Sequence, residues 1–168
     1  MTDRDHVGEI LANWERERPD LDASPIGVFG RIARINRRLD THLDKFLYPH
    51  GLTLGLFDVL AALRRVGHPH RAKPSELAAT SLLTSGGMTG RLDQLEGLGL
   101  VKRVSDPNDR RVTFAQLSAG GLALIDTLFA EHLKREAALL SGLGAEQQIQ
   151  LAALLEVVES TVSANRSL

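Results

Sequence analysis

The sequence predicts a mainly helical fold with one small β-hairpin, and three observations support this prediction. Over most of its 168 residues, apolar side chains recur at the i, i+3, i+4 and i+7 spacing of an amphipathic helix. Two short helical patterns are followed directly by two β-compatible segments, with a dense cluster of turn-forming residues at 105–109 between them. Further helices precede and follow this unit, so the predicted class is a winged helix-turn-helix with helical extensions at both ends.

Three helices are predicted in the first part of the chain, over residues 3–18, 24–48 and 53–66. In the first, Val7 and Trp14 lie seven residues apart and so share one apolar face. Ser24 followed by Pro25 is typical of an N-cap and the first helical position after it. Thr53 is expected to cap the third helix.

The second part of the chain contains the helix-turn-helix, the hairpin and two longer helices. One short helix opens at 74–77, and a second opens at Thr84 or Ser85 and ends near 97–99. The remaining elements are strands near 100–104 and 111–117, a helix capped by Ser118 that runs to about 140, and a last helix over 145–164.

The net charge is −1, but it is distributed unevenly along the chain. Residues 1–22 carry a net charge of −4 and residues 126–168 carry −3, whereas residues 23–125 carry +6. A basic centre between acidic ends suits a surface that faces nucleic acid, although an accidental division of surface charge would look the same.

The second helix of the helix-turn-helix has an apolar face and a face of small residues. Met88, Leu92 and Leu95 are spaced for burial. Small and hydroxyl side chains on the outer face would let the helix enter a major groove about 12 Å wide, or would simply ease helix packing. The residues expected to contact DNA in the two helices are Ser75, Thr84, Ser85, Gly87 and Thr89.

The hairpin tip, Asp-Pro-Asn-Asp-Arg-Arg at 106–111, is the most specific feature of the sequence. Arginines at the end of a two-stranded projection can reach the narrow, electronegative minor groove beside the site that the helix reads. We therefore expect Arg110 and Arg111 to contact DNA, with Asp109 bracing one of them through a bidentate ion pair. A solvated surface turn is the alternative, which the position after a helix-turn-helix disfavours.

Residues 74–121 resemble the multiple-antibiotic-resistance regulator (MarR) family. The resemblance rests on the segments LLTSGGMTGRLDQLE, GLVKR and DPNDRR. The family's wing motif, an aspartate two residues before an arginine, falls on Asp109 and Arg111, whereas LSAGG stands where the family commonly has Leu-Thr-Pro and a later glycine. The resemblance extends over nearly the whole chain. It implies a ligand-responsive transcriptional regulator, usually a repressor, that binds a palindromic double-stranded DNA operator as a homodimer.

Dimers of this family interlock through their terminal helices, and the last helix of this chain fits that arrangement. Leu151, Leu154, Leu155 and Val158 form a stripe too apolar for a solvated helix. The expected organisation is an extra N-terminal helix over 1–22, dimerisation helices over 23–50 and 119–168, and a winged helix-turn-helix DNA-binding domain over 51–118.

The extra helix resembles a subfamily whose best-known members respond to urate. That resemblance carries the urate-binding tryptophan, aspartate and two arginines onto Trp14, Asp58, Arg91 and Arg103. Such a set suits a flat aromatic anion, because indole stacks on it, arginine binds its charge and aspartate accepts from ring N–H groups.

The residues themselves support part of this set and leave alternatives open. Asp58 is the only charged residue between Leu52 and Leu63, so it should lie in or beside the core and need a partner. Arg91 lies on the inward-leaning flank of its helix. Trp14 would equally serve to anchor the extra helix, and Asp58 would equally form a structural salt bridge in a sensor of phenolic acids. A ligand-independent architectural DNA-binding protein is a further alternative.

Other classes of function have little support in the sequence. Cysteine is absent, which excludes disulfides and thiolate metal sites, and His68 with His70 is too small a set for zinc. No nucleophile–base arrangement, phosphate loop or HExxH motif is present, so we expect neither an enzyme nor a cofactor.

With no apolar run of about 18 residues and no signal-peptide pattern, we expect a cytoplasmic protein without membrane contact. Four arginines at 31, 34, 37 and 38 form either an anion-contacting cluster or a solvated helix face.

Overall fold

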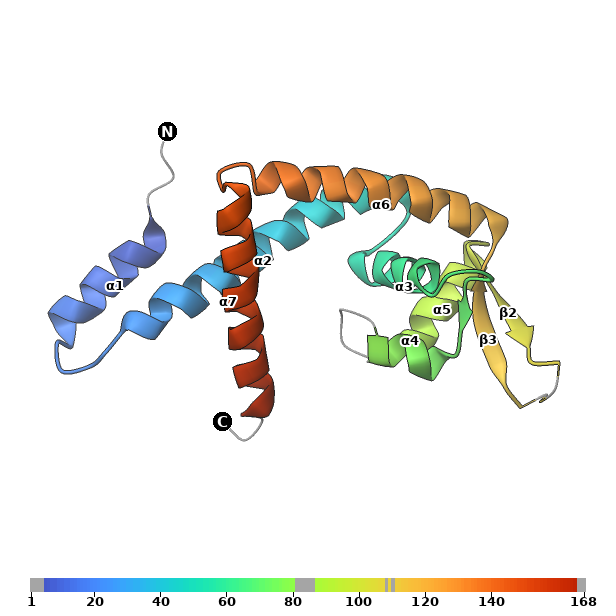
Figure 1. Ribbon diagram of the computed structural model, residues 1–168, viewed down its shortest axis with the longest axis horizontal. Coiled ribbons are helices and arrows are strands. Elements are labelled where there is room, and N and C mark those ends of the chain that lie inside the picture. Colours follow the sequence, from blue (N-terminus) through green and yellow to red (C-terminus); the bar gives the residue numbers. More distant parts are fainter. Residues whose placement is uncertain (1–4, 81–86, 108, 110, 166–168) are drawn as a thin grey trace.

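The computed structural model describes residues 5–80, 87–107, 109 and 111–165. It is mainly helical with one small antiparallel sheet, which confirms the predicted fold class. The elements are α1 (His6–Glu17), α2 (Ser24–Leu47), the 3-10 turn η1 (Tyr48–His50), α3 (Leu54–Arg65), β1 (Arg71–Ala72), α4 (Pro74–Thr80), α5 (Met88–Gly97), β2 (Val101–Ser105), β3 (Thr113–Leu117), α6 (Ala119–Leu139) and α7 (Ala145–Ala164). The molecule is elongated, with α3, α4, α5 and the sheet gathered at one end and α1 at the other (Figure 1).

Side chains cap several of the helices. Thr53 accepts a hydrogen bond from a backbone N–H in the first turn of α3, and Ser118 does the same for α6, which confirms both predicted caps. The prediction for Ser24 was wrong, because Ser24 is already the first residue of α2 and Ala23 occupies the cap position. The carboxylate of Asp22 accepts from the N–H of Ser24 and thereby takes over part of the capping.

The sheet has three antiparallel strands in the order β1-β3-β2. β2 and β3 form the predicted hairpin, with Arg103 opposite Ala115. The expectation that the hairpin holds the only strands was wrong, since β1 pairs Arg71 with Gln116 of β3. β1 has two residues, too few to show the alternation by which a strand is recognised in a sequence. Its pairing fastens the segment before α4 to the hairpin.

Apart from Val7 of α1, the buried apolar residues gather in one lobe, which comprises the described residues between 46 and 128 and is called the core lobe below. Leu60, Leu63, Leu77, Leu95 and Ile125 are almost completely buried there, between α3, α4, α5, α6 and the sheet. Among the described residues, no single helix is long and apolar enough to cross a membrane; α2 with η1 meets that test only jointly with α3, across a bend of 77°.

Candidate functional site

The exposed face of α5 carries the small side chains that were expected to face DNA. Met88, Leu92 and Leu95 are buried against the core lobe, as predicted, whereas Thr89 and Gly90 are exposed. Gly87 precedes the helix with a φ of 82°, a left-handed conformation that a residue with a side chain rarely adopts. The expected DNA contacts Thr84 and Ser85 lie outside the described residues.

The remaining expected contact of the helical pair, Ser75, is exposed in the first turn of α4. α4 packs on both α3 and α5, so its orientation relative to α5 is set by the core lobe. Leu77 supplies the buried side of α4 and has no exposed surface. Ser75 and Thr89 are therefore both exposed to solvent on helices whose opposite faces pack against the core lobe.

The hairpin tip is a tight turn built by two aspartates. The backbone N–H of Asp109 donates to Oδ1 of Asp106, and Oδ1 of Asp109 accepts from the backbone N–H of Arg111 at 3.0 Å. The prediction that Asp109 braces an arginine side chain needs correction for Arg111, because Asp109 holds the backbone of that residue and not its guanidinium group. The Arg111 side chain is exposed at the tip, and Arg110 lies outside the described residues.

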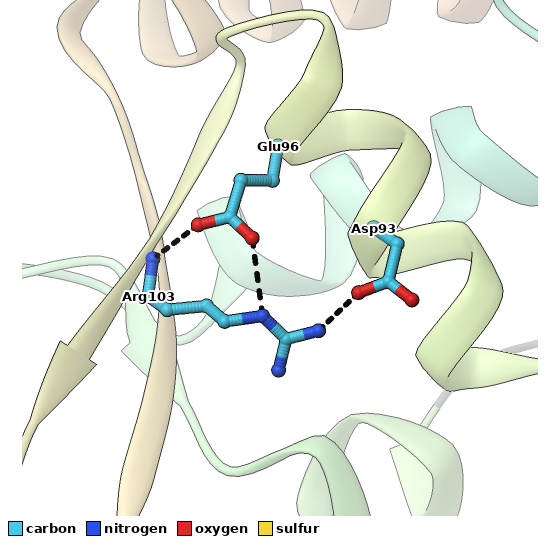
Figure 2. Close-up of polar contacts among 3 residues, drawn as sticks. All are labelled: Asp93, Glu96 and Arg103. Atoms are coloured by element: carbon cyan, nitrogen blue, oxygen red, sulfur yellow. Dashed lines mark hydrogen bonds and ion pairs between the residues drawn. The ribbon is translucent and has the colours of Figure 1, made fainter.

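Arg103 joins the wing to α5 (Figure 2). Its Nε donates to Glu96 at 3.1 Å, its backbone N–H donates to the same carboxylate, and its guanidinium also pairs with Asp93. The hydrogen bond that the Arg103 guanidinium donates to Asp93, and then the one that it donates to Glu96, raise the pKa of this guanidinium group. We call this three-residue contact the wing clamp, because it connects β2 to the exposed flank of α5.

Asp58 and Arg91 both lie at the interface between α3 and α5. Asp58 is 7% exposed, which confirms that this carboxylate lies in the core region. Arg91 lies against α3, since a Cβ atom added to Gly55 would be 2.9 Å from Nε of Arg91. Gly55 is one helical turn before Asp58, so the two side chains approach the same stretch of α3.

The structure does not bring the four residues of the expected urate site together within one chain. Trp14 is 45% exposed on α1, which packs on α2 at the far end of the molecule from α3 and α5 (Figure 1). Arg103 is held at Asp93 and Glu96, on the flank of α5 roughly opposite to Arg91 at about 100° per residue. The four residues were grouped because their types and positions match a sequence motif. A sequence motif does not specify the distances between residues in the folded chain.

Sequence reasoning missed two features that the structure shows. The first is the pair Asp93 and Glu96, whose i, i+3 spacing on a helix next to a basic strand was the available signal. The second is a groove of about 220 Å³ between α2 and α6. In this groove the guanidinium carbon of Arg135 lies 4.6 Å from the centroid of the Phe46 ring, a cation–π contact. His132 lines this groove with a buried Nδ1 that has no hydrogen-bond partner among the described residues, and no sequence pattern indicated it. Within the described ranges, no cluster of three potential metal ligands occurs.

Comparisons with known proteins identify relatives of the whole chain and of its central part. A profile of the MarR family matches residues 50–112. The HTH-type transcriptional regulator PecS of Dickeya dadantii is 38% identical over 95% of this chain and 96% of its own length. Two solved structures share the fold: AbsC, a MarR family transcriptional regulator from Streptomyces coelicolor (TM-score 0.75, 23% identity, 86% of this chain and 98% of that one), and BpsR of Bordetella bronchiseptica, whose DNA binding is regulated by 6-hydroxynicotinic acid (TM-score 0.69, 21% identity, 79% and 92%).

Proposed function

The chain belongs to the MarR family of transcriptional regulators, and from this premise we propose that it is a repressor released from a palindromic operator by a small aromatic anion. Regulators of this family bind DNA as dimers and respond to small molecules, and they are not enzymes. The proposal adds the operator symmetry, the direction of regulation and the chemical class of the effector.

The observation that carries the DNA-binding part is the wing clamp. Because Arg103 connects β2 to α5, the helix and the wing are held as one unit, which suits simultaneous contact with a major groove and the neighbouring minor groove. The DNA contacts that we propose are Ser75, Thr84, Ser85, Gly87 and Thr89 from the helical pair and Asp109, Arg110 and Arg111 from the wing.

A homodimer is supported by the terminal helices. No residue of α7 is buried, and Leu151, Leu154 and Leu155 are 40%, 65% and 43% exposed. Leaving such a stripe in water is costly at about 25 cal/mol per Å² of apolar surface. In our proposal this stripe packs against a second copy, and the two α5 helices then meet half-sites about 34 Å apart.

For the effector we propose a site centred on Asp58 and Arg91. A buried carboxylate and an arginine at the base of the DNA-reading helix can hold a flat anion such as urate, with Asp58 accepting from ring N–H groups and Arg91 binding the charge. A ligand that draws on Arg91 would shift α5 relative to its half-site. In this proposal Trp14 reaches the site from the second copy of the dimer, since its own chain holds it at the opposite end of the molecule.

The test is release of the protein from DNA by urate. The operator is first selected from a random duplex pool, and complex formation is then followed by fluorescence anisotropy while urate is added. We expect release of the wild type, loss of release for Arg91→Gln with DNA affinity kept, and weaker release for Trp14→Ala. No release at millimolar urate in either the wild type or Trp14→Ala would reject urate as the effector.

A second effector class is favoured by the groove between α2 and α6. Arg135 above an apolar floor suits an aryl carboxylate or a phenolic acid, and BpsR, with the same fold, is regulated by 6-hydroxynicotinic acid. The same assay separates the two sites. Release by salicylate that Arg135→Gln abolishes and Arg91→Gln leaves intact would assign the effector to this groove. A selected duplex that no small anion releases would instead favour an architectural role.

A further inference from the structure

The cleft between α1 and α2 is lined mainly by basic side chains. Its volume is about 300 Å³, within the range of small-molecule sites, and Arg31, Arg34 and Arg38 of α2 face it together with His6 of α1. Asp5 is the acidic residue of its lining. This cleft involves none of the residues assigned above to DNA or to the aromatic effector.

The three arginines are concentrated on one face of α2. Their spacing of i, i+3 and i+7 places them in a row about 10 Å long. Asp5 neutralises one of them, since its Oδ2 lies 2.5 Å from a terminal nitrogen of Arg31. The described residues of the lining therefore include three guanidinium groups and one carboxylate.

Arg34 is the central residue of the row and is only partly exposed. Within the part of the chain that the structure describes, its side chain makes no hydrogen bond or ion pair, in contrast to that of Arg31. Partial burial of a guanidinium group without an acceptor is unfavourable, and an anion in the cleft would remove that cost.

We propose that this cleft binds a small phosphate-bearing anion, with Arg34 as its central contact and with Arg31 and Arg38 on either side. A phosphate monoester has three strong acceptor oxygens, so it can accept hydrogen bonds from more guanidinium groups at once than the two oxygens of a carboxylate can. Guanidinium groups bind phosphate in a bidentate geometry. The apolar lining consists of Val7 and Ile35 and is small beside the three arginines, so charge rather than an extended apolar surface selects the ligand.

The location of the cleft separates this site from DNA. α1 lies at the end of the molecule opposite to α5 and the wing, so an operator held by those elements does not extend over the cleft of the same chain (Figure 1). A free phosphate compound is therefore the occupant that the arrangement favours over the phosphates of the operator.

The test is calorimetric titration of the full-length protein with inorganic pyrophosphate at low ionic strength. We expect Arg34→Gln to weaken binding about tenfold or more, the loss of one charge-assisted contact. The matched control is Arg37→Gln, which removes the same charge from the same helix but lies outside the cleft and should change the affinity less than about twofold.

A third variant should act in the opposite direction. Asp5→Asn keeps an N-cap side chain for α1, because asparagine caps helices as well as aspartate does, but it frees Arg31 from its ion pair. Pyrophosphate should then bind about threefold to fivefold more tightly, since a like-charged neighbour of the ligand is removed.

Four results would overturn the proposal. The absence of pyrophosphate binding at millimolar concentration is the first, and equal losses in Arg34→Gln and Arg37→Gln, which indicate unspecific surface charge, are the second. The third is a dimer that dissociates in Arg34→Gln, because the cleft is then covered by a second copy. The fourth is weaker binding of the selected duplex by Arg34→Gln without phosphate present, because the arginines then contact DNA.

Discussion

The core lobe and the helices outside it differ in how much of their apolar surface is buried within a single chain. In the core lobe, leucines from five helices, α2 to α6, are almost completely buried. In α7 the apolar residues are as frequent, but none is buried. Both regions have regular helices, so the difference lies in packing and not in secondary structure.

This difference indicates which properties belong to one chain and which need two. The elements that we propose to read DNA, α5 and the wing, are positioned by contacts inside the core lobe and by the wing clamp, so their local geometry does not depend on a partner. In our proposal, the spacing of the two α5 helices depends instead on the surface of α7, whose apolar residues are not buried within one chain. The proposed effector would then act on this spacing without unfolding the core lobe.

The largest expected effect concerns a close approach inside the core lobe. A Cβ atom at Gly121 would lie 2.0 Å from the carbonyl oxygen of Leu100, a backbone atom that cannot move aside easily. We expect Gly121→Ala to reduce the free energy of unfolding by about 3 kcal/mol, at the upper end of overpacking effects. Gly120→Ala is the matched control, because its nearest neighbour is 3.7 Å away, and it should be neutral or stabilise by up to about 1 kcal/mol. Urea unfolding of both variants measures this, and equal stabilities would contradict the close contact.

The second expected effect tests whether α7 is completed by another copy. Leu154→Gln should raise the dimer dissociation constant about thirtyfold, or about 2 kcal/mol, since burying a leucine contributes about 1.5–3 kcal/mol. Ala153→Gln places the same side chain about 100° around the helix from Leu154 and should change the constant little. Sedimentation equilibrium gives both constants. If Leu154→Gln remains as dimeric as the wild type, the exposed apolar stripe of α7 is not explained by packing against a second copy.

The elements of both regions were predictable, because periodicity and caps are local properties of a sequence. The final helix was predicted with its observed bounds, and the caps Thr53 and Ser118 were predicted correctly. Strand β1 was not predicted, because two residues that pair with a strand 45 positions away carry no local signal. Burial of Asp58 was also predictable, since it interrupts an apolar run.

The composition of the candidate sites was less predictable than the fold. Which arginine meets which acid depends on how elements pack, and Arg103 is held by Asp93 and Glu96 although neither was singled out. The grouping of Trp14 with Arg91 fails within one chain for the same reason, since helix α1 extends away from α5 (Figure 1). The sequence can indicate single residues on surface elements. The distances between them depend on how the elements pack, which the sequence pattern does not show.

The third expected effect tests the wing as part of the reading unit. Arg111→Ala should weaken binding to the selected duplex at least about tenfold, or about 1.4 kcal/mol, because an arginine contact in the minor groove is lost. Arg37→Ala removes the same charge from α2 and should have a much smaller effect. Anisotropy titrations at several salt concentrations separate contact from general attraction, and a tenfold loss in both variants would indicate the latter.

The smallest expected effect tests whether the wing clamp orients α5. Asp93→Ala removes a negative charge from the exposed flank of that helix, so electrostatics alone would make DNA binding tighter. Loss of the clamp acts in the opposite direction, because Arg103 then no longer fixes β2 against α5. Exposed ion pairs contribute about 0–1 kcal/mol, so we expect binding to weaken by about twofold to threefold. Asp126→Ala, which removes an acid from α6 away from α5, serves as the control. Because the two mechanisms predict opposite signs, tighter binding by Asp93→Ala would mean that the reading helix is oriented by the core lobe without the clamp.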